Sequence, residues 1–335
     1  MDLLANLAST FAQQIQSPTL GFLLGGMLLA ALGSRLEVPD AIYKFVVFML
    51  LIRIGLEAGM EIKEAELASI LLPVLAAAFV GCAIVLAGRV TLPRLPGVRT
   101  EDGIATAGLF GAVSASTLAA ALVVLDESGV EFEAWVPALY PFMDIPALIL
   151  AIVLASVHQK RVEGVGDGKI GYAEIVVDSL RGSAVSALLL GIVLGLLTRP
   201  ESVFESFYDP LFRGLLSILM LVLGIEAWSR LSELRGVAHW YAVYAFVAPL
   251  LHGLLAFALG YLLHLATGFS PGGVILFAVI ASSNSDISGP PTLRAGIPRA
   301  NPSAYIGSST AIGTPMAIGA GIPLYLTLAQ IVFGL

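Results

Sequence analysis

The segment A-S-S-N-S-D-I-S-G-P-P, at residues 281–291, interrupts an apolar run that extends from 272 to 297. It places serines, an asparagine, an aspartate, a glycine and two prolines in the middle of a stretch long enough to cross a membrane. In hydrocarbon every backbone N–H and C=O group needs a partner, so a broken polar segment survives there only where protein or a water-filled cavity surrounds it. We therefore interpret this segment as a break in a membrane helix and as a candidate site for an ion or small solute.

A second interruption of small and hydroxylic residues, A-V-S-A-S-T-L-A-A, lies at 112–120 in another apolar run. Ser114 and Ser116 precede Ser283 and Ser285 by the same 169 positions. A constant offset is hard to obtain by chance, and this one also pairs Asp40 with Asp209, Lys44 with Arg213, Gly55 with Gly224, Glu57 with Glu226, Gly103 with Gly272 and Pro146 with Pro315. The chain is therefore predicted to contain one structural unit twice.

Composition places the chain in a membrane. Of its 335 residues, 58% are hydrophobic and 12% are charged, and the mean hydropathy is +0.93. Soluble domains carry about 25% charged residues, so the composition excludes a soluble protein. The single cysteine, Cys82, excludes a disulfide framework and a cysteine-rich metal site. We expect no cofactor other than a coupling ion, and no nucleic-acid partner.

A helix that crosses a membrane needs about 20 mainly apolar residues. This criterion predicts ten helices, at 17–33, 41–56, 67–90, 103–125, 135–157, 180–197, 211–228, 237–266, 272–297 and 303–333. A polar connection at 158–178 separates a first repeat, 17–157, from a second, 179–335, and is predicted to be a cytoplasmic linker. Residues 1–16 lack the Lys or Arg of a signal peptide and are predicted to form an interfacial segment.

The basic residues predict the orientation. With the N-terminus outside, thirteen of the 17 Lys and Arg residues fall toward the cytoplasm, while the outer loops are acidic. Cytoplasmic loops of membrane proteins carry the excess of Lys and Arg, so the N-terminus, and with ten helices also the C-terminus, is predicted to lie outside.

Each predicted repeat has five helices, so the second repeat must lie upside down relative to the first. Inverted repeats with broken helices at matching positions are typical of secondary transporters, whose site lies near the middle of the membrane. The predicted fold is an all-α membrane protein with two inverted five-helix repeats, in which helices 4 and 9 are broken and cross.

The second half of each broken helix is predicted to begin at mid-membrane. Ser, Thr and Asp favour helix N-caps and Pro favours the first turn, as found near 114–117 and 285–291. Two helix N-termini that face each other form an anion site, because their free N–H groups and dipoles are positive. The candidate anion-binding residues are Gly111, Ala112, Ser114, Ala115, Ser116, Thr117, Ser283, Asn284 and Ser285.

The first half of each broken helix ends at the same level and leaves backbone carbonyls free. Carbonyls and a carboxylate together suit a hard cation such as Na⁺. A lone ionised carboxylate in the membrane costs at least ~2.5 kcal/mol, so a counter-ion is expected. The candidate Na⁺ ligands are Phe110, Asp144, Ser282, Ser283 and Asp286. An anion site beside a cation site predicts symport.

Packing explains several other residues better than binding does. Glycines allow membrane helices to approach closely, and we assign this role to Gly21, Gly25, Gly26, Gly191 and Gly195. Arg53 and Glu57 are four residues apart and are interpreted as a structural ion pair.

Long segments of the chain resemble the SbtA-type sodium-dependent bicarbonate symporters of cyanobacteria. They are S-P-T-L-G-F-L-L-G-G-M at 17–27, F-M-L-L-I-R-I-G-L at 48–56, A-L-Y-P-F-M-D-I-P-A-L at 138–148, F-Y-D-P-L-F-R-G-L-L-S-I-L-M-L at 207–221, S-D-I-S-G-P-P-T-L-R-A-G-I-P at 285–298 and A-N-P-S-A-Y-I-G-S-S-T-A-I-G-T-P at 300–315. The resemblance covers almost the whole chain.

This resemblance implies Na⁺-coupled bicarbonate uptake for inorganic carbon concentration, at the bacterial plasma membrane. It also implies a core domain and a gate domain, an elevator-like mechanism, a homotrimer, and a PII-like regulatory protein of the SbtB type on the cytoplasmic face. In that family the connection between helices five and six is often longer than 158–178 here. If that loop helps to bind the regulator, regulation of this chain differs or is weaker.

The residue types alone leave alternatives open. Another small anion or an organic carboxylate would suit the same hydroxyls, and Asp144 with Asp286 would also suit Na⁺/H⁺ exchange. An intramembrane aspartyl protease is disfavoured, because Asp144 corresponds to Gly313 in the repeat and is no mate of Asp286. The glycine-aspartate signature that such proteases place around the second aspartate is also absent at Asp286, which follows S-N-S.

Overall fold

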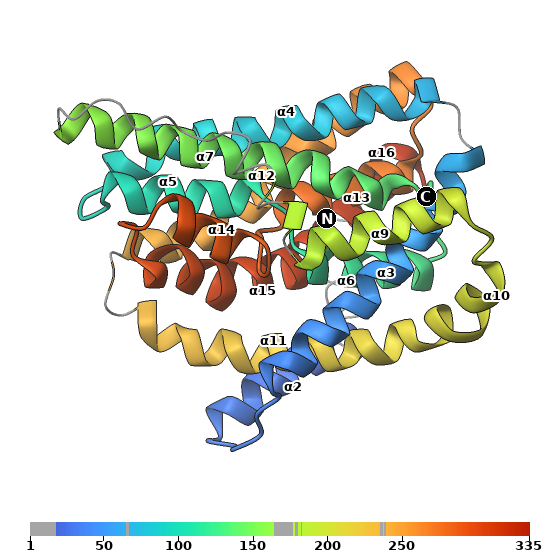
Figure 1. Cartoon of the computed structure of the whole chain (residues 1–335), viewed down its shortest axis with the longest axis horizontal. Helices are drawn as coiled ribbons and strands as arrows, with labels where there is room; N and C mark the ends of the chain where they lie inside the picture. Colours follow the sequence, from blue (N-terminus) through green and yellow to red (C-terminus); the bar gives the residue numbers. More distant parts are fainter. Residues whose placement is uncertain are drawn as a thin grey trace.

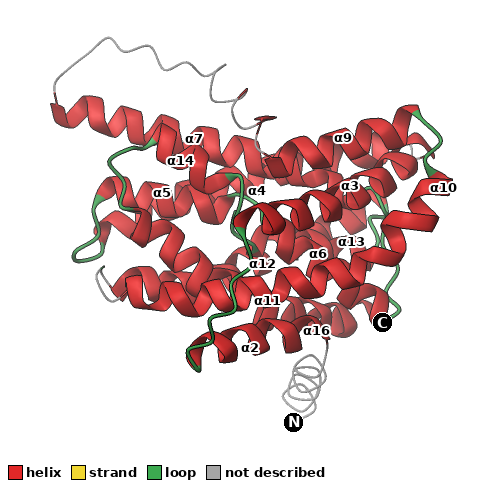
Figure 2. Ribbon diagram, turned by 60° about the horizontal axis from the view of Figure 1, so that its bottom comes forward, coloured by secondary structure: helices red, strands yellow, loops and turns green. Residues whose placement is uncertain are grey.

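The computed structural model describes residues 18–335 apart from 65–66, 164–176, 178–179, 182, 235–236 and 238. Within these residues every regular element is a helix (Figures 1 and 2). The predicted interfacial segment 1–16 lies outside the described residues, as does most of the predicted linker. At the start of that linker, the helix that contains Asp144 continues as far as Glu163.

The helices follow the predicted order, with ends shifted by a few residues. In chain order they are α2 (Pro18–Ala31), α3 (Asp40–Glu64), α4 (Leu67–Thr91), η1 (Leu92–Arg94), α5 (Thr100–Gly111), α6 (Ala115–Glu127), η2 (Val136–Leu139), α7 (Tyr140–Glu163), α9 (Ser183–Leu197), α10 (Glu201–Val203), η3 (Phe204–Tyr208), α11 (Asp209–Leu234), α12 (His239–Thr267), α13 (Pro271–Ser282), α14 (Gly289–Gly296), η4 (Ser303–Gly307), η5 (Ser309–Gly313), α15 (Thr314–Met316), η6 (Ala317–Gly321) and α16 (Ile322–Phe333).

Six helices in the described part of the chain are long and apolar enough to cross a membrane. Three more apolar helices are shorter: Pro18–Ala31, Ser183–Leu197 and Pro271–Ser282. At 1.5 Å per residue, the 14 residues of α2 span only about 21 Å of a hydrocarbon core that is about 30 Å thick. The structure therefore shows a multi-pass helical membrane protein, and the count of ten spans stays a prediction.

Both predicted helix breaks are present. Helix α5 ends at Gly111 and α6 begins at Ala115, with extended backbone at Ala112 and Ser114. Helix α13 ends at Ser282, and α14 begins at Gly289 with prolines in its first turn. Proline suits this position because it lacks the N–H that a first turn leaves unbonded. Two half-helices therefore begin inside the protein, as the sequence predicts.

Helix positions and contacts follow the sequence offset. Helices α3 and α11 begin at Asp40 and Asp209, which are separated by the same 169 residues as Ser114 and Ser283. Helix α3 packs along α9, and α11 packs along α2 (Figure 1). Since α9 corresponds to α2 and α11 corresponds to α3, each of these contacts pairs one helix from each half of the chain. These two equivalent helix pairs support the prediction of two repeats.

Close packing of these four helices depends on glycine. A methyl group at Gly26 would lie 2.1 Å from the Leu221 carbonyl oxygen, and one at Gly195 would lie 2.4 Å from that of Leu56. Gly191 is also packed against α3, so the packing role predicted for these three glycines is confirmed. Gly21 and Gly25 have no neighbour within 4 Å of a Cβ position in the described residues, so the packing prediction fails for them within this chain.

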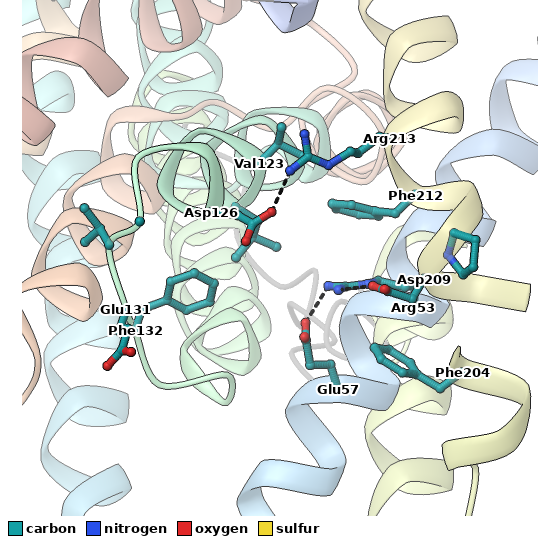
Figure 3. A pocket seen from close by; sticks show the side chains of 14 residues that line it. Arg53, Glu57, Val123, Asp126, Glu131, Phe132, Phe204, Asp209, Phe212 and Arg213 are labelled. Atoms are coloured by element: carbon teal, nitrogen blue, oxygen red, sulfur yellow. Dashed lines mark hydrogen bonds and ion pairs between the residues drawn. The ribbon is translucent and has the colours of Figure 1, made fainter. Parts of the chain in front are cut away.

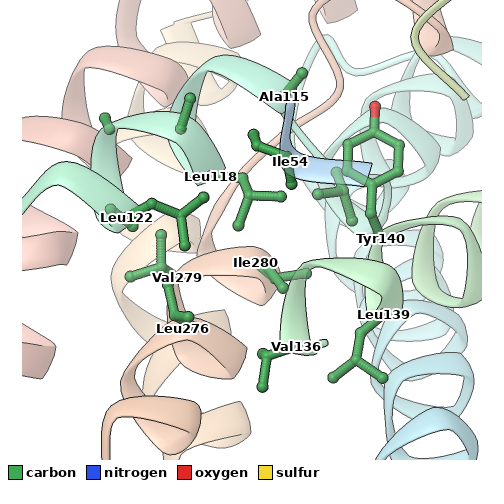
Figure 4. Packing of buried hydrophobic residues seen from close by; sticks show 14 of the residues in the cluster. Ile54, Ala115, Leu118, Leu122, Val136, Leu139, Tyr140, Leu276, Val279 and Ile280 are labelled. Carbon is green, nitrogen blue, oxygen red and sulfur yellow. The ribbon is translucent and has the colours of Figure 1, made fainter. Parts of the chain in front are cut away.

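Apolar side chains bury the first break between helices from both halves. Leu118 and Leu122 of α6 lie against Val279 and Ile280 of α13 in one buried cluster (Figure 4). Ile54 of α3 belongs to the same cluster. This packing fixes α6, and with it the polar break at its start, inside the molecule.

Candidate functional site

The two helix breaks contact each other directly. The Ser114 amide donates to Ser283 Oγ at 3.0 Å, and the Ser285 amide donates to the Leu109 carbonyl at 2.9 Å. Ser114 and Ser283 are repeat mates, so each break supplies a hydrogen-bond partner to the other. The structure thus brings the candidate residues of both breaks into one buried polar region.

The N-terminus of α6 is organised by Ser114. Its Oγ accepts hydrogen bonds from the Thr117 amide and from Thr117 Oγ1, both at 3.1 Å, and lies 2.8 Å from Ser116 Oγ. An N-cap hydroxyl of this kind satisfies one of the four N–H groups that a helix leaves free at its start. All three side chains are fully buried. The predicted helix start and its hydroxyl cluster are therefore both present.

Asp286 lies at this same N-terminus. Its Oδ2 accepts a hydrogen bond from Ser116 Oγ and a second from Ser114 Oγ at 3.2 Å. Its Oδ1 is buried and has no hydrogen-bond partner among the described residues. A negative carboxylate is stabilised at a helix N-terminus by the free N–H groups and the helix dipole. The structure thus brings Asp286 to the hydroxyls that the sequence assigned to the anion.

Asp144 joins the two breaks from α7. Its Oδ1 accepts the Val113 amide at 2.9 Å, and its Oδ2 accepts Ser288 Oγ at 3.2 Å. Val113 lies between α5 and α6, whereas Ser288 lies just before α14. Asp144 is fully buried, so one carboxylate ties together two backbone segments that are distant in sequence.

Asn284 contacts two residues that the candidate set does not include. Its Oδ1 accepts hydrogen bonds from Ser309 Oγ and from Thr314 Oγ1, the latter at 2.9 Å. Its Nδ2 is buried without a partner among the described residues. Ser309 and Thr314 lie in a largely π-helical stretch, η4 to η6, and such stretches often mark functional sites. The hydroxyl-rich sequence at 308–314 was the available signal for them.

The other candidate residues are buried in the same region. Ser282 Oγ and Ser283 Oγ donate to carbonyls one turn earlier in α13, those of Val279 and Ile280. Ser285 Oγ accepts the Gly289 amide at 2.8 Å and so satisfies the first N–H group of α14. Phe110, next to the last residue of α5, has its ring edge against Tyr244, at 5.2 Å between ring centroids. Gly111 ends α5, Ala112 follows it in the break, and Ala115 begins α6.

A cavity of about 540 Å³ reaches the site, and we call it the inner cavity because the orientation prediction places its basic residues toward the cytoplasm. Asp286 belongs to its lining, whereas the other candidate residues do not. Basic residues from α3, α11 and α14 also line it: Lys44, Arg230 and Arg294. These belong to the basic set that the orientation prediction places on the cytoplasmic side.

A second cavity of about 900 Å³ lies between α3, α6 and α11, and we call it the outer cavity because the orientation prediction places its acidic loop residues outside (Figure 3). Arg53 binds Glu57 at 2.5 Å and Asp209 at 2.6 Å, and its guanidinium lies over the Phe212 ring at 4.6 Å. The predicted Arg53–Glu57 pair is thus confirmed. Arg213 binds Asp126 at 2.6 Å and Glu127 at 2.7 Å. None of the candidate site residues lines this cavity.

Residues 18–330 match the family model of the Na⁺-dependent bicarbonate transporter superfamily. No curated protein matches the chain.

Proposed function

Because this chain belongs to the Na⁺-dependent bicarbonate transporter superfamily, we propose that it imports bicarbonate by Na⁺ symport, in support of inorganic carbon concentration. The observation that carries this proposal is the hydrogen-bonded junction of the two helix breaks, with Asp286 between the α6 N-terminus and a cavity. One polar region there offers both the N–H and hydroxyl donors that suit an anion and the oxygen ligands that suit Na⁺.

In the proposed Na⁺ site, Asp286 supplies the charge. Its Oδ1 is buried and has no partner in the part of the chain that the structure describes, which is costly for a carboxylate and which a cation would relieve. Asp144, the hydroxyls of Ser282 and Ser283, and the Phe110 carbonyl are proposed as the further ligands. The two hydrogen bonds of Asp144 hold that carboxylate beside the breaks.

In the proposed anion site, bicarbonate lies at the N-terminus of α6. Ser114, Ser116, Thr117, Ser283 and Ser285 contribute hydroxyls, Asn284 contributes its amide, and Gly111, Ala112 and Ala115 contribute backbone. Bicarbonate both donates and accepts hydrogen bonds, so neutral hydroxyls and N–H groups suit it. The Nδ2 of buried Asn284, which no described residue binds, is a donor that needs such an acceptor.

We propose that this conformation faces the cytoplasm. The inner cavity reaches Asp286, while the outer cavity has no candidate residue in its lining. Movement of a core, α4–α7 with α12–α16, against gate helices α2, α3, α9 and α11 would open the site to the other side in an elevator-like cycle. In this proposal both termini lie outside, and the protein is a homotrimer in a cyanobacterial plasma membrane, regulated by a PII-like protein.

Uptake of labelled bicarbonate into proteoliposomes tests the proposal. An inward Na⁺ gradient should drive uptake, whereas a K⁺ gradient should not. Asp286→Ala should abolish Na⁺-dependent uptake while the protein still inserts, as judged by size-exclusion chromatography of the solubilised sample. Uptake that does not depend on Na⁺ would exclude symport. Full activity of Asp286→Ala would show that Asp286 does not belong to the site.

A further inference from the structure

The carboxylate of Asp286 occupies the position that the proposed function assigns to the transported anion. Its Oδ2 accepts a hydrogen bond from Ser116 Oγ and lies 3.2 Å from Ser114 Oγ, the N-cap oxygen of α6. Both serines are fully buried. The hydroxyls at the start of α6 thus already bind a negative group that belongs to the protein.

Carboxylate and bicarbonate present the same recognition group, a planar carbon with two oxygens that share a negative charge. The donors at the start of α6 that suit one therefore suit the other. Two such anions at one helix N-terminus repel each other strongly, because like charges in contact are unfavourable at a desolvated site. Bicarbonate and the Asp286 carboxylate would therefore compete for the start of α6.

The second oxygen of Asp286 shows how this competition can be relieved. Oδ1 is buried with no partner among the described residues, and the Asp286 side chain lines the inner cavity. Residues 283–288 lie outside α13 and α14, so the backbone that carries Asp286 can adjust without breaking a helix. A cation that binds Oδ1 would neutralise the carboxylate and draw it from Ser114 and Ser116.

We propose that Asp286 is a built-in competitor of bicarbonate, and that Na⁺ must bind first to displace it from the N-terminus of α6. This inference rests on the proposed function and adds an order of binding to it. Coupling then resides in one side chain: without Na⁺ the anion site is blocked by the protein itself, and with Na⁺ it becomes available. Asp286 is in this view more than a Na⁺ ligand.

The two roles of Asp286 make opposite predictions for a neutral side chain. If Asp286 is only a Na⁺ ligand, Asp286→Asn loses Na⁺ dependence and binds bicarbonate in Na⁺-free buffer as weakly as the native chain. If it is a competitor, Asp286→Asn binds bicarbonate in Na⁺-free buffer more tightly than the native chain, by about tenfold or more, since a like charge has been removed.

The experiment measures equilibrium binding of labelled bicarbonate to the purified full-length protein, in choline buffer with and without Na⁺ at fixed pH. Asp102→Asn is the matched control, because Asp102 is a buried aspartate of α5 that lies outside both breaks and accepts the Asn301 amide at 2.8 Å. We expect the gain in Na⁺-free binding for Asp286→Asn and for Asp286→Ala, and no gain for Asp102→Asn.

The outcomes separate the two levels of the proposal. Native protein that binds no bicarbonate even in Na⁺ would overturn the proposed function. Native protein that binds with Na⁺, combined with no gain in the Asp286 variants or an equal gain in Asp102→Asn, would overturn only the competition. The native chain also gives a test without variants: a bicarbonate affinity that does not change with Na⁺ concentration contradicts the proposed order.

Discussion

Asp144 and Asp286 are both carboxylates at the helix breaks, but their hydrogen bonds differ. Both oxygens of Asp144 accept hydrogen bonds, one from each break. Asp286 uses one oxygen at the start of α6, and its other oxygen, beside a cavity, has no partner among the described residues. The two hydrogen bonds of Asp144 connect the breaks, whereas the second oxygen of Asp286 is available to a ligand.

Asp144→Ala is expected to lower the thermal stability of the detergent-solubilised protein. The substitution leaves the buried Val113 amide and Ser288 hydroxyl without their partner, and each buried unsatisfied group costs about 1–3 kcal/mol. Asp144→Asn keeps an acceptor oxygen and should cost less. An unfolding temperature for the alanine variant equal to that of the native chain would show that Asp144 does not join the breaks.

Ser116→Leu is expected to reduce bicarbonate uptake to background. Ser116 is fully buried at the start of α6, so the larger side chain fills the position proposed for the anion and removes a hydroxyl donor. Ser186→Leu is the matched control, because Ser186 is an exposed serine in α9. Uptake assays at several bicarbonate concentrations measure the KM of each variant. An unchanged KM for Ser116→Leu would show that the anion binds elsewhere.

At the scale of elements, the close helix pairs depend on glycine at contacts between the two halves of the chain. A methyl group at Gly224 would lie 2.0 Å from the Leu23 carbonyl oxygen, and one at Gly55 would lie 2.4 Å from that of Leu188. These two glycines are related by the sequence offset, and each holds its helix against a helix from the other half. The repeated sequence thus specifies two equivalent pairs, α3 with α9 and α11 with α2.

Gly224→Ala should separate α11 from α2, at a cost of about 1–3 kcal/mol for overpacking a close contact. Gly214→Ala provides the control in the same helix, because nothing lies within 4 Å of its Cβ position. Alanine is the better helix former by about 1 kcal/mol, so the control should be neutral or slightly stabilised. Thermal unfolding of both variants tests this, and equal stabilities would contradict the packing.

In the molecule as a whole, two cavities lie on different sides of the broken helices. Ion pairs line the outer cavity and connect the helices around it. Arg213 of α11 binds Asp126 and Glu127 at the end of α6, so one guanidinium connects a proposed gate helix to the proposed core. The three side chains are 56%, 71% and 31% exposed. Exposed pairs contribute only about 0–1 kcal/mol, so in the proposed cycle this contact would bias the conformational equilibrium without locking it.

Arg213→Gln is expected to favour the outward-open form by up to about fivefold, the effect of about 1 kcal/mol. The measurement is the reaction rate of an impermeant maleimide with a cysteine placed at Val123, which lines the outer cavity, in a Cys82→Ser background. A cysteine at Ala295, which lines the inner cavity, should become correspondingly less reactive from the other side. No change at either position would show that the Arg213 pairs do not bias the equilibrium.

The class of protein, the helix order and the two breaks could all be predicted from the sequence, because they follow from local composition. Apolar runs predict membrane helices, and hydroxyls, glycine and proline inside them predict where a helix ends and restarts. The 169-residue offset predicted matching helices without any contact information. The sequence also identified Asp144 and Asp286 as candidate site residues, since carboxylates are rare in apolar runs.

The contacts between side chains of distant segments follow from tertiary packing and could not be predicted from the sequence. The roles of the two aspartates depend on partners from distant segments, such as Ser116 for Asp286 and Val113 for Asp144. Ser309 and Thr314 reach Asn284 through a π-helical stretch whose register the sequence does not reveal. Hydrogen bonds between distant segments depend on the position and direction of whole helices, which are fixed by packing and not by the residues at the site.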